Sequence, residues 1–204
     1  ELSRRSDLRY SYRFLFAPGT IGAISWLVHN RATTENIRFG LTAANLGDSS
    51  GFSYKRSRRG DAAIDRIVTD AIERCAVTGQ TEPFLPDGYD ERQFCCPGFD
   101  LPVGALSRSR RGKFSEYHTS ADNLDFIDRE NLLTSLDLLR DVVDRVEDEH
   151  HDSVERPMTD SPTDSPQGPI YRTPKPFGEP FLGRYGIMDW ISIDRDRLNA
   201  VPLI

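Results

Sequence analysis

Three stretches of the chain repeat apolar residues at helical spacing, and strand-like stretches alternate with them. On the longest of these stretches, the side chains expected to face the core are Leu132, Leu133, Leu136, Leu139, Val143 and Val146. Strand–helix alternation favours an α/β sandwich built on a parallel or mixed sheet. The expected strands cover residues 9–17, 37–46 and 101–106, and the expected helices cover residues 21–30, 61–76 and 128–149.

The composition changes sharply after residue 150. Residues 153–176 contain six prolines among Ser, Thr and Asp, and they have few apolar side chains. Such a segment buries too little apolar surface to offset the entropy lost on ordering, which predicts a disordered linker. We therefore expect one domain over residues 1–152, a linker over 153–176 and a short further piece over 177–204.

Charge and cysteine content exclude several classes of protein. The net charge of −6 comes from acidic and basic residues that are interspersed over most of the chain. This balance gives no bulk attraction to nucleic acid or to an anionic membrane. The chain has no apolar run long enough to span a bilayer. Its three cysteines lack metal-site spacing, and adjacent Cys95 and Cys96 suit a disulfide poorly, so a reducing cytoplasm is expected.

One histidine lies where an α/β fold gathers functional groups. His118 stands between an expected strand and the long helix, in the sequence Tyr-His-Thr-Ser-Ala-Asp. An imidazole nitrogen is a good zinc ligand, and Asp122 could orient the ring or cap the following helix. Taken alone, a histidine in a loop is more often a solvated or helix-capping residue.

The motifs around this histidine resemble zinc aminopeptidases of the leucyl-aminopeptidase and glutaminyl-cyclase superfamily, over about residues 5–150. They are most similar to a bacterial aminopeptidase-like branch associated with polysaccharide biosynthesis. The motifs that carry the resemblance are Tyr12-Arg13-Phe14-Leu15-Phe16, Pro18-x-Thr20-Ile21-Gly22, Asp90-Glu91-Arg92-Gln93, Pro97-Gly98-Phe99, Leu101-Pro102-Val103-Gly104 and Tyr117-His118-Thr119-Ser120.

The resemblance implies a three-layer α/β/α zinc-peptidase-like domain that is incomplete at its N-terminal side. Gly178-Glu179-Pro180 with Leu182-Gly183-Arg184 resembles the start of a small winged-helix-like domain, of which residues 177–204 would be a remnant. The implied cofactor is zinc, and the implied substrate is a small molecule or peptide that contains an amide or an amino group.

The same resemblance suggests roles for individual residues. His118 would be a metal ligand and Asp48 a second one, although a turn-forming Gly-Asp pair explains Asp48 equally well. The residues that would line the substrate pocket are Asp90, Glu91, Arg92 and Tyr117. In the alternative account of Asp90 to Arg92, a buried Asp–Arg pair pins the loop over residues 82–100.

Two departures from the family pattern concern the metal site and the general base. The family's first metal ligands come from an earlier His-containing loop and an Asp-Asn-x-Ser-Gly segment, and neither occurs here. Gly19 stands where the family has a glutamate that acts as general base, and glycine cannot accept a proton from metal-bound water. No catalytic residue is therefore assigned, and weak zinc binding without turnover is expected of the chain alone. A non-catalytic binding or scaffolding role in cell-surface polysaccharide assembly is the alternative function.

Three other groups each admit two interpretations. The basic clusters at 55–59 and 108–111 could bind acidic ligands, or they could be solvated loop faces. The acidic, histidine-containing run at 147–152 could chelate a metal, but a solvated helix end is favoured. Cys95 and Cys96 could ligate a metal, but a place in the core is favoured.

Overall fold

The computed structural model describes residues 2–85, 88–110, 112–149 and 176–177. The helices expected at 21–30, 61–76 and 128–149 are confirmed as α1, α2 and α4. In chain order the elements are η1 (Leu2–Arg4), α1 (Ile21–His29), η2 (Arg31–Asn36), β1 (Gly40–Ala43), β2 (Phe52–Lys55), α2 (Ala63–Arg74), β3 (Gly79–Glu82), α3 (Glu91–Phe94), β4 (Val103–Ser107) and α4 (Arg129–Asp148).

The four strands form one mixed sheet in the order β1-β4-β2-β3. β1 pairs with β4 in parallel, and β2 pairs with β3 in parallel. The two parallel pairs meet where β2 runs antiparallel to β4. The expected strands at 37–46 and 101–106 correspond to β1 and β4. The sequence patterns missed β2 and β3, each of which is only four residues long.

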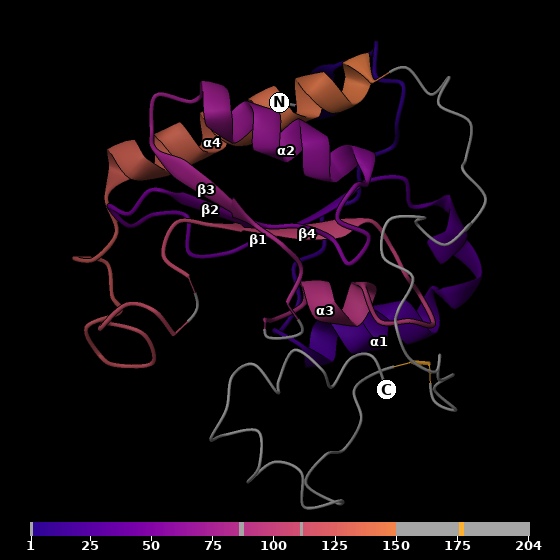
Figure 1. Cartoon of the computed structure of the whole chain (residues 1–204), viewed down its shortest axis with the longest axis horizontal. Helices are drawn as coiled ribbons and strands as arrows, with labels where there is room; N and C mark the ends of the chain where they lie inside the picture. Colours follow the sequence, from indigo (N-terminus) through magenta and orange to yellow (C-terminus); the bar gives the residue numbers. More distant parts are fainter. Residues whose placement is uncertain (1, 86–87, 111, 150–175, 178–204) are drawn as a thin grey trace, which may run out of the picture.

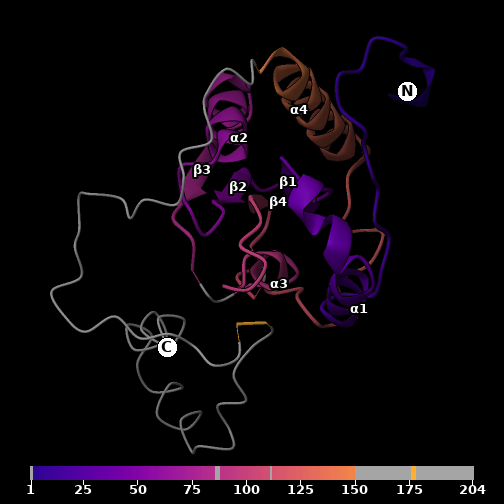
Figure 2. The same cartoon turned by 90° about the vertical axis from the view of Figure 1, so that its right-hand side faces the viewer.

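Helices cover both faces of this sheet, which gives the expected three-layer α/β/α arrangement. α2 and α4 pack together on one face, and α1 and α3 lie on the other (Figures 1 and 2). Each face has its own core. Phe52, Tyr54 and Leu106 belong to the cluster under α2 and α4, whereas Leu27 and Val103 belong to the cluster under α1 and α3.

The long helix α4 buries a face that only partly matches the expected one, since Val146 is buried and Leu139 packs against the core as expected. Its buried side chains are Ser135, Leu138, Val142 and Val146. Leu132, Leu133 and Leu136 are 42–46% exposed in the described part of the chain. The prediction that these three side chains face the core was therefore wrong. The helix starts at a cap formed by Asp128, whose carboxylate accepts the amides of Glu130 and Asn131. Asp122 therefore does not cap α4.

A buried carboxylate joins α2 to the sheet. Asp65 is 1% exposed and accepts a hydrogen bond from the Tyr54 hydroxyl at 2.8 Å. It also accepts the Ser57 amide at 2.7 Å, the Ser57 hydroxyl at 2.6 Å and the Ala62 amide at 3.1 Å. Burial, together with the neighbouring Asp65 charge, raises the pKa of Tyr54 far above its ordinary value. Asp65 therefore satisfies polar groups of three different segments in the core.

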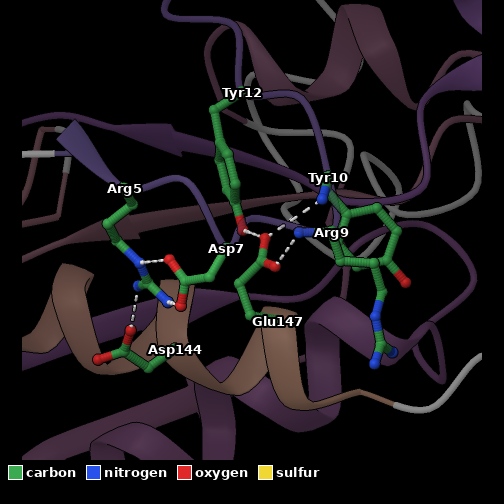
Figure 3. Close-up of polar contacts among 7 residues, drawn as sticks. All are labelled: Arg5, Asp7, Arg9, Tyr10, Tyr12, Asp144 and Glu147. Atoms are coloured by element: carbon green, nitrogen blue, oxygen red, sulfur yellow. Dashed lines mark hydrogen bonds and ion pairs between the residues drawn. The ribbon is translucent and has the colours of Figure 1, made fainter. Parts of the chain in front are cut away.

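The strand expected at residues 9–17 is absent, and a side chain holds this segment instead (Figure 3). Glu147 of α4 accepts hydrogen bonds from the Arg9 amide at 2.5 Å, the Tyr10 amide at 3.4 Å and the Tyr12 hydroxyl at 2.6 Å. Arg5 bonds Asp144 one helical turn earlier, at 2.7 Å. The alternating aromatic residues thus mark an extended segment that is anchored to α4 rather than to a neighbouring strand.

The burial of Glu147 raises its pKa, but the hydrogen bonds from Tyr12, Arg9 and Tyr10 outweigh this effect and lower it overall. Glu147, at the head of the acidic run at 147–152, is thus a structural anchor, whereas residues 150–152 lie outside the described part of the chain. No helix among the described residues is both long and apolar enough to cross a membrane. Residues 153–175 and 178–204, which include most of the expected linker and of the expected C-terminal piece, also lie outside the described part.

Candidate functional site

Two loops that are far apart in the sequence meet beside the first turn of α1. The Thr20 amide donates a hydrogen bond to Oδ1 of Asp90, seventy residues later in the chain. Next to this bond, a Cβ added at Gly19 would overlap the Tyr89 hydroxyl group. These contacts bring Gly19, the position that the family pattern gives to its general base, next to the loop that carries Asp90. We call the four residues Gly19, Thr20, Tyr89 and Asp90 the loop pair.

The backbone of the loop pair is strained at Thr20. This residue has φ 60° and ψ −64°, a region that β-branched side chains rarely adopt. The Ile21 amide donates to the Gly19 carbonyl at 2.7 Å, so the three residues form a γ-turn. Asp90 holds the central amide of that turn. Strain of this kind persists where the surroundings fix the backbone, and it is concentrated at functional sites.

Asp90 has a carboxylate with one oxygen not engaged by the described residues. Its Oδ1 accepts from Thr20, whereas no hydrogen bond from the described residues reaches Oδ2. Burial raises the pKa of Asp90, and the charge of neighbouring Glu91 raises it further. The Thr20 amide and Arg92 act in the opposite direction without cancelling the rise. A cationic group bound at Oδ2 would relieve this unfavourable environment of the carboxylate.

Glu91 and Lys55 pin the loop that carries Asp90. Glu91 is 2% exposed and forms an ion pair with Lys55 of β2. Its two carboxylate oxygens also accept the Tyr89 amide at 3.0 and 3.1 Å. Arg92 donates from Nε to the Tyr89 carbonyl at 3.3 Å. The ion pair between Glu91 and Lys55 therefore pins this loop, which was the role that the alternative account gave to an Asp–Arg pair. Asp90 is left to face α1.

Of the two interpretations of Asp48, its hydrogen bonds support the turn-forming one. Its Oδ1 accepts the Ser50 amide and the Ser109 hydroxyl, each at 2.8 Å, and its Oδ2 accepts the Ser109 amide at 3.1 Å. Burial raises the pKa of Asp48, but these hydrogen bonds outweigh burial and lower it overall. The carboxylate thus ties the turn after β1 to the end of β4. Its role as a metal ligand stays a prediction.

We expect Asp48→Ala to lower the free energy of unfolding by about 1–3 kcal/mol at neutral pH, because the buried amide and hydroxyl of Ser109 and the part-buried Ser50 amide lose their acceptor. The folded pKa lies below the ordinary value of 3.8, so this stabilisation is present above pH 3.8 and is lost as the pH falls through the folded pKa. Urea unfolding at a series of pH values measures the difference, with Asp70→Ala on the exposed side of α2 as control. A destabilisation that stayed constant down to the lowest accessible pH would contradict the role of the Asp48 charge.

His118 lies on an exposed part of the loop between β4 and α4. It has φ 58°, and its ring stacks on Tyr117 with the ring centroids 3.9 Å apart. Tyr117 in turn packs edge-on against Phe114. In Figure 1 the segment 112–128 extends to the lower left of the sheet and is separated from α1 and α3. A common site for His118, Asp48 and Asp90 stays a prediction, because the described contacts of these residues do not join them.

A zinc site is not complete among the residues that the structure describes. Within them, no group of three or more His, Cys, Asp or Glu side chains is placed to hold a metal ion. Stable zinc sites use three or four protein ligands, and Asp48 already directs both its oxygens to Ser50 and Ser109. The described residues alone therefore do not complete a zinc site.

The basic clusters and the cysteines are used within the fold. Arg58 and Arg59 both bond Asp100, and Arg110 pairs with Glu82. Arg108 is 3% exposed, donates to Ser135 and to backbone carbonyls of residues 50 and 131, and lies over the Phe52 ring. Burial raises the pKa of Cys95 to about 11, so its thiol is protonated at neutral pH and belongs to the core.

Sequence reasoning missed Tyr89 and Lys55 as members of this region. Tyr89 precedes the Asp90 motif directly, and an aromatic residue at a loop tip was the available signal. Lys55 lies in a strand that the patterns did not reveal, so its pairing with Glu91 had no sequence signal. Thr20 belonged to a quoted motif, but its strained turn appears only in the backbone.

Comparison with solved structures agrees with this architecture. A crystal structure from Clostridium acetobutylicum, described as that of a candidate peptidase, matches with a TM-score of 0.69 and 45% sequence identity, over 72% of this chain and 34% of that chain. The domain is therefore an α/β protein with a peptidase-like structural neighbour.

The chain belongs to the family described as "Domain of unknown function (DUF4910)", whose model matches residues 1–149. A curated Clostridium acetobutylicum relative is 47% identical over 139 residues, which cover 68% of this chain and 32% of the relative. That protein is named for polysaccharide biosynthesis and for an aminopeptidase-like domain. The chain thus spans about a third of the length of the relatives it matches.

Proposed function

We propose that this chain is part of an aminopeptidase-like hydrolase of polysaccharide biosynthesis, and that Asp90 holds the amino group of its substrate. The observation that supports this proposal most strongly is the meeting of Gly19 and Thr20 with Tyr89 and Asp90. Both loops carry motifs of the aminopeptidase-like branch, and the relatives' names point to the same class. A place in the cytoplasm remains part of the proposal.

The chemistry of Asp90 suits an ammonium group. Its Oδ2 oxygen has no hydrogen bond from the described residues, and partial burial strengthens the attraction of the carboxylate for a cation. The Thr20 amide fixes the direction of the carboxylate through Oδ1, so the side chain is oriented before a substrate arrives. A carboxylate in this position recognises a free amino group and discriminates against an acylated one.

Zinc remains the proposed cofactor, with His118 and Asp48 as predicted ligands and with further ligands from beyond the described residues. When bound, zinc would polarise the scissile carbonyl and activate water. Glu91, Arg92 and Tyr117 remain proposed residues of the substrate pocket. The structure gives Glu91 a second task, because it holds the Tyr89 amide and pairs with Lys55.

Substrate binding without turnover is a second candidate function, and the observation that favours it is at Gly19. Glycine offers no proton acceptor, and the Tyr89 hydroxyl occupies the place where a side chain at position 19 would begin. A glutamate there would require Tyr89 to move. Product analysis with a zinc-loaded full-length protein that contains this chain distinguishes binding from hydrolysis.

The test of the proposed recognition uses two matched ligands, leucinamide and N-acetyl-leucinamide. We expect leucinamide to shift the amide resonances of Thr20 and Glu91 in a saturable way, because its ammonium group binds Asp90. Acetylation removes the positive charge, so the second ligand should leave these resonances unchanged at equal concentration. Equal shifts from both ligands would show that the loop pair does not recognise the amine.

A further inference from the structure

The described residues Pro176 and Phe177 contact the domain far from their place in the sequence. The Gly98 amide donates a hydrogen bond to the Pro176 carbonyl at 2.6 Å. The Phe177 ring packs edge-on against Phe99, with centroids 4.9 Å apart and an interplanar angle of 64°. The Arg31 guanidinium lies over the Phe177 ring, 4.2 Å from its centroid.

Three residues from two segments build the receiving surface, which we call the aromatic slot: Arg31, Gly98 and Phe99. Arg31 opens η2, and Gly98 and Phe99 lie in the turn between α3 and β4. Figures 1 and 2 both show residues 176–177 next to the layer that contains α1 and α3. Phe99 itself packs against the buried cluster of Leu27 and Val103, so the floor of the slot is part of the core.

The slot requires glycine at position 98. A Cβ there would overlap the Phe177 ring, and the three nearest atoms to that Cβ all belong to Phe177. The backbone of Gly98 is outside the left-handed region, so the glycine is not needed for a turn conformation. The absence of a side chain therefore serves the close approach of the aromatic ring.

From these contacts we infer that the aromatic slot is a binding site for a short Pro-aromatic peptide segment, occupied by the chain's own Pro176-Phe177. The recognised features are one backbone carbonyl, which accepts a hydrogen bond from the Gly98 amide, and an aromatic ring on the next residue. Proline suits the first position because it fixes its own φ and lowers the entropy lost on binding. Edge-to-face packing and the guanidinium over the ring supply the attraction for the second.

The role of the slot is to attach the sequence after residue 177 to the face of the domain that carries α1 and α3. Twenty-six residues, 150–175, separate the end of the main described region from this attachment point. The linker expected from the sequence ends at residue 176. Its last residue contributes the carbonyl that Gly98 binds, so the attachment begins inside the stretch whose composition predicted no packing.

Hydrogen exchange at the amide of residue 98 tests this inference in the full chain, because that amide is bonded to Pro176 only while the slot is occupied. We expect Phe177→Ala to increase exchange at this amide by a factor of about ten, since both ring contacts are lost. Gly98→Ala should produce a similar increase by expelling the ring. Phe16→Ala is the matched control, because Phe16 is 94% exposed and lies in another segment.

The inference is overturned if exchange at position 98 is the same in Phe177→Ala as in the unaltered chain. It is also overturned if protection of this amide rises with protein concentration, since a second copy would then supply the Pro-Phe segment. Protection that is independent of concentration and lost in both slot variants, but kept in Phe16→Ala, supports the attachment within one chain.

Discussion

Asp65→Ala is expected to lower the free energy of unfolding by about 3–5 kcal/mol, because a buried carboxylate leaves several donors without a partner. The donors are the Tyr54 hydroxyl, the Ser57 amide and hydroxyl, and the Ala62 amide. Tyr54 is fully buried, so water cannot replace the lost acceptor without disturbing the core. A single small domain has roughly 5–15 kcal/mol of stability, so this one change removes a large share of it.

Denaturant unfolding measures this effect, with Asp61→Ala as the matched control. Asp61 precedes the same helix and is exposed, so its removal should change the stability by no more than about 0.5 kcal/mol. Tyr54→Phe should cost less than Asp65→Ala, because it removes only one of the donors and leaves the carboxylate its others. A change below about 1 kcal/mol for Asp65→Ala would contradict the structural importance of this network.

The helices were predictable because their spacing carries the signal over many residues. Ile64, Ile67, Val68, Ala71 and Ile72 are buried on α2 as the sequence pattern indicates. α4 shows the limit of this reasoning. Its leucines extend around more than one side, and the sequence pattern placed Leu133 in the core where the structure buries Leu138.

The strands were harder to predict because each is only four or five residues long. Residues 9–17 have the clearest alternation in the chain, yet their backbone is held by Glu147 and by no strand. The opposite error concerns β3 (Gly79–Glu82), whose polar sequence has no strand-like pattern. It pairs with β2 through backbone hydrogen bonds, which do not depend on the identity of its side chains and so cannot be predicted from them.

Part of the candidate site could be predicted and part could not. The resemblance named both loops as parts of the site, and the structure shows that they contact each other. The sequence could not reveal that Asp90 binds the Thr20 amide, or that Glu91 forms the ion pair with Lys55. Those partners depend on the paths of two loops and of a strand that no pattern indicated.

Asp90→Asn is expected to weaken the binding of leucinamide about ten- to a hundredfold, because a hydrogen bond between charged groups is worth about 1.5–3 kcal/mol. Asparagine keeps an oxygen that can accept the Thr20 amide, so the γ-turn at Thr20 should survive. The variant therefore removes the charge and retains the local structure. Asp100→Asn is a suitable control, since Asp100 is a carboxylate that already pairs with Arg58 and Arg59.

The most direct measurement of the central claim is the dissociation constant of leucinamide for the unaltered chain and for Asp90→Asn, followed at the Thr20 amide. The account predicts saturable binding to the unaltered chain, a loss of at least about tenfold in Asp90→Asn, and no comparable loss in Asp100→Asn. Equal dissociation constants for the unaltered chain and Asp90→Asn would contradict the account, because the Asp90 charge would then play no part in holding the amine.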